Sequence, residues 1–356
     1  MITYSFAEGF IERQPLSQAL LQTIRLLGEF KGKQELFREQ SPQVLETLRQ
    51  ASMIESTESS NRLEGITAPH GRIAELVARR VRPKNRPEQE IAGYRDVLNN
   101  IHANRAHAPF TIAAVLKIHR DLYKFSTEEA GKWKRRDNEI TETLPDGTKK
   151  LRFKPVPAAA TPKAMEALHT AFNKAWESGK VEPLLLIPAY VLDFLCIHPF
   201  LDGNGRAARL LTLLLLYKAG YEVGRFISLE QLVERTRDSY YETLLASSQQ
   251  WHKGRHTLVP WWEYFLGVML LGAYRTFSER VGAVSATRGA KREMIVDVVS
   301  RVPHEFQFAD VERACPGVSR PTINRALADL RRAGKIKCIK AGRDAVWRKR
   351  KMTNDE

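Results

Sequence analysis

Residues 198–209 read HPFLDGNGRAAR and stand between two apolar stretches of the chain. The stretch before them, 184–197, reads LLLIPAYVLDFLCI and predicts a buried helix. The stretch after them, LLTLLLLYKAG, predicts a second helix that ends at Gly220. The twelve residues therefore contain a tight loop, with Gly203, Asn204 and Gly205, between two helices.

This loop has the features of an anion site. A glycine-rich turn that enters a helix directs backbone N–H groups of Gly203, Asn204 and Gly205 toward one point, where the helix dipole adds partial positive charge. Arg206 and Arg209 follow on the first turn, three residues apart, and each guanidinium can hold a phosphate through two hydrogen bonds. The pattern predicts a site for a phosphate-bearing substrate.

Two further side chains supply the chemistry. Asp202 is a hard oxygen ligand suited to Mg²⁺ that bridges phosphates, and His198 can accept a proton near neutral pH. Other phosphate or metal motifs fail: Arg206 and Ala207 occupy places where an EF-hand needs Asp, Asn or Gly, and residues 28–33 are too short for a Walker A loop. The combination predicts phosphoryl or nucleotidyl transfer.

The string 198–209 is similar to the signature of the Fic family, H-P-F-x-D/E-G-N-G-R-x-x-R, and every specified position matches. The resemblance covers most of residues 55–275. It implies a mainly α fold, a Fic-type helical bundle with a β-hairpin flap. It also implies a protein adenylyltransferase that transfers AMP from ATP to a Ser, Thr or Tyr hydroxyl of a protein, itself included. Phosphate-transferring members carry Lys where this chain has Gly205, which favours AMP transfer.

The resemblance assigns a role to each residue of the motif. His198 is the base that deprotonates the target hydroxyl, Asp202 holds Mg²⁺, and Phe200 packs into the core. The Asn204 side chain helps to cradle the phosphates, while Arg206 and Arg209 bind the outer ones. The implied ATP site comprises Asp202, Gly203, Asn204, Gly205, Arg206, Ala207, Ala208, Arg209, Tyr240 and Ser248.

Residues 237–251, RDSYYETLLASSQQW, resemble the family helix that lines the adenine pocket. Tyr240 is the expected contact. Ser248 stands where relatives often carry Asn, and Gln249 is a substitute for it. A Tyr-Tyr pair in a helix is also typical of a protein core.

Residues 55–66 read ESTESSNRLEGI, and Ser60-x-x-x-Glu64-Gly65 resembles the family's inhibitory pattern. In the family this helix packs on the active site, and its Glu pairs with the second motif arginine, here Arg209. The pairing would occupy the Arg209 guanidinium, the group that is expected to hold the γ-phosphate. The other interpretation is a plain helix surface with a glycine that ends the helix.

Residues 138–156, NEITETLPDGTKKLRFKPV, contain two β-type runs around a Pro-Asp-Gly turn and predict a β-hairpin. By position the hairpin matches the family flap that clamps a target protein. An exposed edge strand pairs with an extended segment through main-chain bonds. A simple surface hairpin is the alternative.

Residues 287–356 hold 17 Lys and Arg against 9 Asp and Glu. The difference, a net charge of +8, is more than half of the chain's +15. Their pattern resembles a winged helix-turn-helix with helices at about 290–301, 308–314 and 319–333 and a final hairpin. The residues expected to contact DNA are Arg320, Thr322, Asn324, Arg325 and Arg343. Winged domains also bind proteins or form dimers.

The 356 residues divide into three expected blocks: 1–105 with the inhibitory helix, 106–280 as the catalytic core, and 287–356. Three cysteines without a C-x-x-C pair exclude a disulfide framework or cysteine zinc site and suggest a reducing compartment. No apolar run reaches the length of a membrane span, and the N-terminus does not read as a signal peptide. We expect a cytoplasmic protein without membrane contact.

Two other functions remain open from the sequence. A DNA-binding regulator would use the Fic-like region to sense a nucleotide without turnover. An enzyme of the same architecture would remove AMP or transfer another nucleotide. The sequence also leaves open the target protein and residue, whether the chain forms a homodimer, and what relieves the inhibition.

Overall fold

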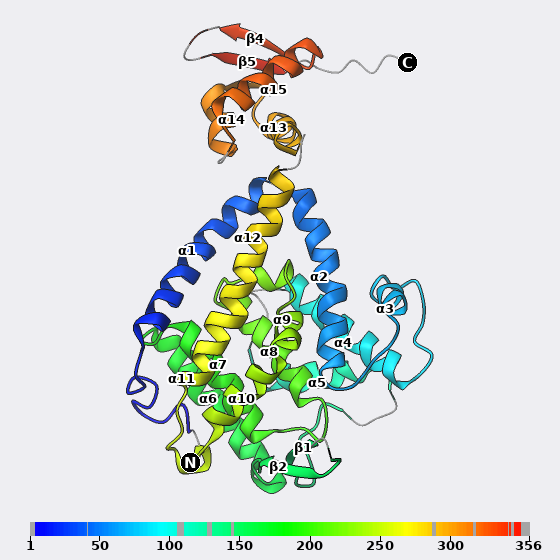
Figure 1. The fold of residues 1–356 in the computed structure, drawn as a ribbon, viewed down its shortest axis with the longest axis vertical. Helices are drawn as coiled ribbons and strands as arrows, with labels where there is room; N and C mark the ends of the chain where they lie inside the picture. The colour runs from blue at the N-terminus through cyan, green and yellow to red at the C-terminus, as the bar shows by residue number, and fades with distance from the viewer. Residues whose placement is uncertain are drawn as a thin grey trace. The chain divides into compact units, whose positions relative to one another are not determined.

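Helices dominate the chain, and the strands form two small antiparallel sheets (Figure 1). The fold class expected from the sequence, mainly α with a β-hairpin, is confirmed. The computed structural model describes residues 4–40, 42–104, 110–126, 130–143, 146–286, 290–315, 318–340, 342 and 345–349. Within these ranges, no helix has the length and apolar character needed to cross a bilayer.

The chain packs into two units. The first contains residues 1–31 and 48–275, and the second contains residues 32–47 and 276–356. These boundaries differ from the three blocks expected from the sequence, because N-terminal residues pack against later ones. Ser52 Oγ donates to Gly224 O at 3.3 Å, and Arg62 Nη1 lies 3.0 Å from Glu234 Oε1.

Most of the helices lie in the first unit, and α1, α2 and α12 have residues in both units. Helix α2 continues to Arg62, and the helical stretch after residue 229 is broken at Thr236, whose φ and ψ of −115° and 32° are not helical. The elements are α1 (Gln18–Gln40), α2 (Pro42–Arg62), α3 (His70–Val77), α4 (Arg86–Asn104), α5 (Ile112–Leu122), α6 (Thr161–Ser178), α7 (Pro183–Ile197), α8 (Asn204–Lys218), α9 (Leu229–Arg235), α10 (Arg237–Ser248), α11 (Val259–Trp262), the π-helix η5 (Glu263–Leu270) and α12 (Leu271–Ala286).

Helices α7 and α8 form the core of this unit, and nearly every residue in both is buried. Pro188 lies inside α7 and supplies no N–H to the helix. The indole N–H of Trp261 donates to Pro188 O at 2.9 Å, and that of Trp262 donates to Leu185 O at 3.1 Å. These bonds tie α7 to the helices packed on it, so the loop that follows α7 starts from a fixed point.

The hairpin consists of β1 (Ile140–Thr143) and β2 (Lys149–Phe153), with Thr143 opposite Lys149. Asp146 Oδ1 accepts bonds from Thr148 N at 2.9 Å and Thr148 Oγ1 at 2.6 Å, which stabilises the turn. Phe153 stacks on His252 with ring centroids 5.3 Å apart. The hairpin is therefore anchored to the segment after α10 at one end of β2.

The described residues of the second unit from 290 onward form three helices and a three-stranded sheet of order β3-β5-β4. Its apolar core is built from residues of all three helices together with Phe306 and Ile336. The elements are α13 (Ala290–Arg301), β3 (Glu305–Gln307), α14 (Phe308–Ala314), α15 (Arg320–Arg332), β4 (Ile336–Lys340) and β5 (Val346–Lys349).

Candidate active site

The loop between α7 and α8 turns sharply at two residues. His198 ends α7 with φ 52° and ψ 60°, a left-handed conformation that costs a non-glycine residue about 1 kcal/mol or more. Gly203 precedes α8 with φ 77°, where glycine has no steric penalty. The first N–H groups of α8 have no partner within the helix, so its N-terminus is a suitable site for an anion.

The Asn204 side chain closes this loop. Its Nδ2 donates to Phe200 O at 2.8 Å, and its Oδ1 accepts from Phe200 N at 2.9 Å. The sequence predicts that this side chain contacts phosphates, but both amide atoms are instead bonded to the loop itself. Phe200 is fully buried and stacks on His119 with ring centroids 3.7 Å apart, as expected of a core residue.

His198 has the hydrogen bonding of a neutral base. Its Nδ1 lies 3.2 Å from Leu195 O, which can only accept, so Nδ1 carries the proton and Nε2 is the basic nitrogen. Burial lowers the pKa of His198 to about 4, and the Lys134 charge also lowers it, whereas Leu195 O, Glu64 and Asp202 oppose this. The ring is therefore neutral at pH 7 and able to accept a proton.

Asp202 carries an exposed carboxylate beside the N-terminus of α8. Its side chain is 59% exposed, and one oxygen accepts from Gly203 N at 2.7 Å. Among the described residues, no group of three or more His, Cys, Asp or Glu side chains is arranged to hold a metal. Mg²⁺ in nucleotide sites is typically held by one or two carboxylates together with substrate phosphates, and Asp202 fits that mode.

Arg209 is bound by the end of α2. Its Nη2 lies 2.8 Å from Glu64 Oε1 and donates to Ser60 O at 2.9 Å, while its Nε donates to Ser60 Oγ at 2.8 Å. Ser60 is fully buried and Arg209 is nearly so. The sequence predicts this pairing of Glu64 with Arg209, and the structure contains it.

The Glu64 carboxylate also lies against the first turn of α8. A Cβ on Gly205 would be only 2.1 Å from Glu64 Oε1. The backbone after α2 explains this placement, because Gly65 has φ 76° and Ile66 N donates to Asn61 O at 3.0 Å, the bonding of a Schellman turn. Glu64 therefore occupies the anion position formed by α8 and Arg209.

Arg206 does not share this position, contrary to the prediction. It is fully buried, with Nη1 2.6 Å from Glu90 Oε2 and Nη2 donating to the Tyr123 hydroxyl at 2.8 Å. These partners come from α4 and the end of α5, whereas Arg209 faces α2. Arg206 therefore anchors the first turn of α8 and is not arranged to bind outer phosphates. Ala207 and Ala208 are buried and offer only their backbone.

The two side chains predicted to line the adenine pocket are both buried. Tyr240 is 4% exposed, and its ring packs edge-to-face on Trp261 with centroids 5.6 Å apart. Ser248 is buried, and its hydroxyl donates to Leu245 O at 3.0 Å. Ser248 therefore belongs to the packing of α10, whereas Tyr240 is buried and also lines a pocket.

The neighbouring Tyr241 has the exposure that Tyr240 lacks. It is 42% exposed, and the Arg237 guanidinium lies 5.8 Å from its ring centroid. Burial raises the pKa of Tyr241, the nearby Glu64 charge also raises it, and Arg209 lowers it. Tyr241 is thus the aromatic side chain available beside the anion position, and the Tyr-Tyr pattern alone did not distinguish the two rings.

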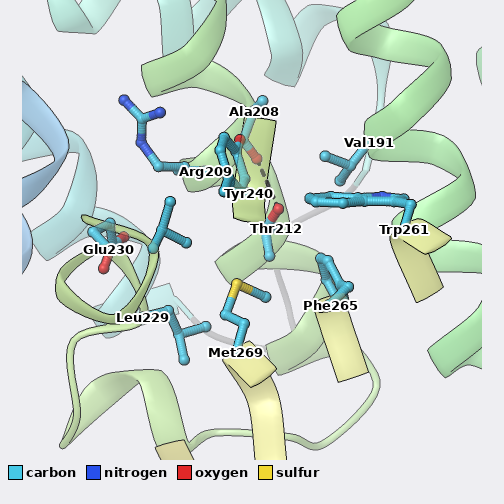
Figure 2. A pocket seen from close by; sticks show the side chains of 11 residues that line it. Val191, Ala208, Arg209, Thr212, Leu229, Glu230, Tyr240, Trp261, Phe265 and Met269 are labelled. Carbon is cyan, nitrogen blue, oxygen red and sulfur yellow. Dashed lines mark hydrogen bonds between the residues drawn. The ribbon is translucent and has the colours of Figure 1, made fainter. Parts of the chain in front are cut away.

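A pocket lies between α7, α8, α9 and the aromatic residues after α10 (Figure 2). Its walls are mostly apolar, and the charged side chains that reach it are Arg209 and Glu230. Figure 2 shows the Arg209 guanidinium pointing away from Trp261 and Phe265. The pocket therefore contacts the stem of Arg209, and its lining does not include His198 or Asp202.

The expected DNA-contacting residues lie at the start of α15. Asn324 and Arg325 are exposed, while Thr322 Oγ1 lies 2.9 Å from Ser319 Oγ. Arg320 is engaged elsewhere, with its Nε 2.8 Å from Glu312 Oε1. Arg343 lies outside the described residues.

Sequence reasoning missed several residues that hold the site. Glu90 and Tyr123 bind Arg206, and their separation from it in the chain left no signal. Lys134 lies before the predicted hairpin, and Asn138 is the first residue of the hairpin segment. Both donate to backbone carbonyls of residues 198–209, the Lys134 N–H to Pro199 O and Asn138 Nδ2 to Phe200 O.

Comparison with known proteins agrees with the site geometry. Residues 109–216 match the Fic/DOC family. This segment of the chain is similar to a Fic/DOC domain. Over 95 residues it is 32% identical to a Fido domain-containing protein of Dictyostelium discoideum, a match that covers 27% of this chain and 62% of that protein. The chain thus spans about three fifths of that relative's length.

Solved structures share the fold at low identity. A Fic family protein from Desulfovibrio desulfuricans superposes with a TM-score of 0.60 at 20% identity, covering 96% of this chain and 98% of the other. A Fic domain-containing signaling protein from Bacteroides thetaiotaomicron gives 0.59 at 21%, covering 73% and 98%. Fic-1 from C. elegans gives 0.56 at 18%, covering 76% and 74%. These similarities support a Fic fold around the α7–α8 loop.

Proposed function

We propose that the protein transfers AMP from ATP to a Ser, Thr or Tyr hydroxyl of a protein, its own chain included, and that Glu64 inhibits this activity. Fic proteins generally transfer AMP or other nucleotidyl groups to proteins. The observation that carries the proposal is the Glu64 carboxylate, which lies on Gly205 and 2.8 Å from Arg209. An acidic side chain fills a position suited to a phosphate, beside a histidine with a basic nitrogen.

The proposed reaction needs one proton acceptor and one anion site. The target hydroxyl oxygen attacks the α-phosphorus of ATP, its proton passes to His198 Nε2, and the bond to the leaving pyrophosphate breaks. The products are a phosphodiester-linked AMP on the protein and pyrophosphate. The α8 N-terminus and Arg209 would stabilise the charge that builds on the phosphates.

Other side chains would complete the nucleotide site. Asp202 would hold Mg²⁺, which when bound neutralises phosphate charge and orients the leaving group. The exposed ring of Tyr241 is available to stack on adenine. The edge of β1 would pair with an extended target segment and bring its hydroxyl to His198.

Inhibition would follow from competition between two anions. Glu64 and the γ-phosphate would both bind Arg209, so ATP that enters while Glu64 is in place cannot adopt the reactive arrangement. The Ser60 bonds keep the Arg209 guanidinium directed toward α2. Removing the Glu64 carboxylate therefore opens the anion position.

We expect Glu64→Gly to raise self-modification by about 10-fold or more, since removing a carboxylate from a charged pair is worth on the order of 1.4 kcal/mol or more. Incorporation of label from [α-³²P]ATP with Mg²⁺ measures this rate. Intact-mass spectrometry should show the addition of one AMP per modified hydroxyl, which also separates AMP transfer from transfer of another group.

Glu58→Gly is the matched control, because it removes a nearby carboxylate, on α2, that pairs with Arg62 and His70 and not with Arg209. It should leave labelling at the parent rate. Equal labelling of the parent and Glu64→Gly chains would remove the inhibitory role, and ATP binding without any covalent product would favour a nucleotide sensor. Loss of AMP from a pre-labelled protein would favour AMP removal.

We further propose that residues 287–356 are a winged helix-turn-helix that contacts DNA. The order helix, strand, two helices and a final hairpin supports this, as do the exposed Asn324 and Arg325 at the start of α15. The recognition helix of such a domain contacts base edges with its N-terminal residues. A protein-binding role for the same unit is the alternative.

Titrating the full chain with a fluorescent 30-base-pair duplex tests this proposal. We expect binding in the micromolar range that weakens steeply as salt rises, as phosphate contacts require. Arg325→Ala should weaken binding several-fold, whereas Arg332→Ala, at the other end of α15 and paired with Asp329, should not. Absence of binding at low salt would exclude DNA contact.

A further inference from the structure

One segment of the chain binds most backbone carbonyls of the loop from Ile197 to Asp202. Lys134 supplies two donors: its backbone N–H donates to Pro199 O at 2.8 Å, and its Nζ donates to Ile197 O at 3.0 Å. The carbonyls on both sides of His198 in the sequence are therefore held by a single residue, which comes from the segment between α5 and β1.

Asn138 holds the next carbonyls. Its Nδ2 donates to Phe200 O at 2.9 Å and to His198 O at 3.3 Å. The Phe200 carbonyl also accepts from Asn204 Nδ2. It is therefore bonded both to Asn204, within the loop, and to Asn138, outside it. The carbonyl of His198 itself is thus bonded to a side chain outside the motif.

A third donor fixes the end of the loop. His119 Nδ1 accepts from Gly131 N at 2.9 Å, so the proton lies on Nε2, which donates to Asp202 O at 3.0 Å. The ring also stacks on Phe200. The loop is thus supported along its length by residues between 119 and 138.

Lys134 and Asn138 are bonded to each other. Lys134 Nζ donates to Asn138 Oδ1 at 2.7 Å, and only 4% of Lys134 is exposed. The ammonium is bonded to two neutral oxygens, and burial lowers the pKa of Lys134 to about 8, with Asp137 opposing. Burying a charged amino group is costly unless its hydrogen bonds are satisfied. The position of Lys134 therefore favours a side chain that donates strong hydrogen bonds.

We infer that Lys134 and Asn138 are positioning residues that hold His198 in its left-handed conformation and connect it to the hairpin. We call the pair the carbonyl clamp. The inference rests on the proposed function, in which His198 is the base. Asn138 lies two residues before β1, so a target segment paired along β1 would fix the residue that bonds His198 O. Target docking and orientation of the base are thereby linked.

The test uses the full chain with Glu64→Gly, and adds Lys134→Met or Asn138→Asp. The first keeps the aliphatic stem and loses the donors. The second keeps the acceptor for Lys134 Nζ but cannot donate to His198 O or Phe200 O. We expect kcat for self-labelling to fall by about tenfold or more with the KM for ATP unchanged, because misplacing a reacting group by about 1 Å can cost 10²-fold.

A second measurement does not depend on activity. Amide hydrogen exchange of residues 197–203 should be at least several-fold faster in both variants, with α7 and α8 as protected as in the parent chain. Arg136→Met is the control, because it removes an exposed positive charge between the two clamp residues. It should change neither kcat nor exchange.

Two results would overturn the clamp. One is that Lys134→Met and Asn138→Asp show the same loop exchange and the same kcat as Arg136→Met. The other is a uniform loss of protection across α7 and α8, which would indicate a general structural role. If the Glu64→Gly chain transfers nothing, the proposed function fails, while the exchange measurement still decides whether the clamp orders the loop.

Discussion

Replacing His198 by alanine in the Glu64→Gly chain should lower AMP transfer by at least about 10²–10⁴-fold, the usual contribution of a positioned base. The basic nitrogen is Nε2, because Nδ1 is bonded to Leu195 O. ATP binding should persist, since neither Arg209 nor the α8 N-terminus depends on the imidazole. Single-turnover labelling together with ATP titration separates the two effects.

Alanine at this position also meets the strained backbone of φ 52°. His198→Asn is therefore the sharper variant, because Asn adopts left-handed backbone more readily than most residues and lacks a base. Both variants should lose activity, and the Asn variant should keep the parent melting temperature. Labelling that survives in His198→Asn would discard the base assignment.

The pH dependence has a defined direction. The folded pKa of His198 is lowered to about 4 from 6.5, so the ring is neutral and basic above that range and protonated below it. Transfer should decline as pH falls through about 4. The same shift makes the neutral ring part of folding stability, which is present above pH 6.5 and lost as pH falls toward 4.

Short-range patterns explain why much of the fold was predictable. The helices around 198–209 are long and apolar, and the glycines at 203 and 220 mark real turns with positive φ. The ranges of α13 and α14 agree with the prediction. The helix break at Thr236 cannot be predicted in this way, because one residue that leaves the helical region carries no periodic signal.

Contacts in the site could be predicted where the motifs name both of the residues that interact. The Ser60 and Glu64 pattern led to Arg209 because the resemblance named the pair. Arg206 was assigned wrongly, because sequence spacing says that two side chains are neighbours on a helix but not what packs against each one. Glu90, Tyr123 and the clamp residues depend on contacts between distant segments, which spacing does not encode.

Variants of Arg209 test separately the two parts of the proposal, inhibition by Glu64 and binding of the γ-phosphate by Arg209. In the parent chain, Arg209→Met removes the partner of Glu64, just as Glu64→Gly removes the partner of Arg209. If Arg209 served only the inhibitory contact, either change would activate the enzyme. Since we propose that Arg209 also binds the γ-phosphate, Arg209→Met should remain inactive, and adding it to Glu64→Gly should lower transfer by about 10²–10³-fold, the usual cost of losing one group that stabilises transition-state charge.

Thermal shifts with ATP and Mg²⁺ give an independent measure. A ligand that binds only the folded chain raises its stability according to concentration over Kd. We expect a larger shift for Glu64→Gly than for the parent, and little shift when Arg209→Met is present. Arg209→Lys keeps the charge but loses the two-pronged geometry and should fall between them. Activation by Arg209→Met equal to that of Glu64→Gly would show that this arginine serves inhibition alone, because the buried guanidinium would then have no part in holding the nucleotide.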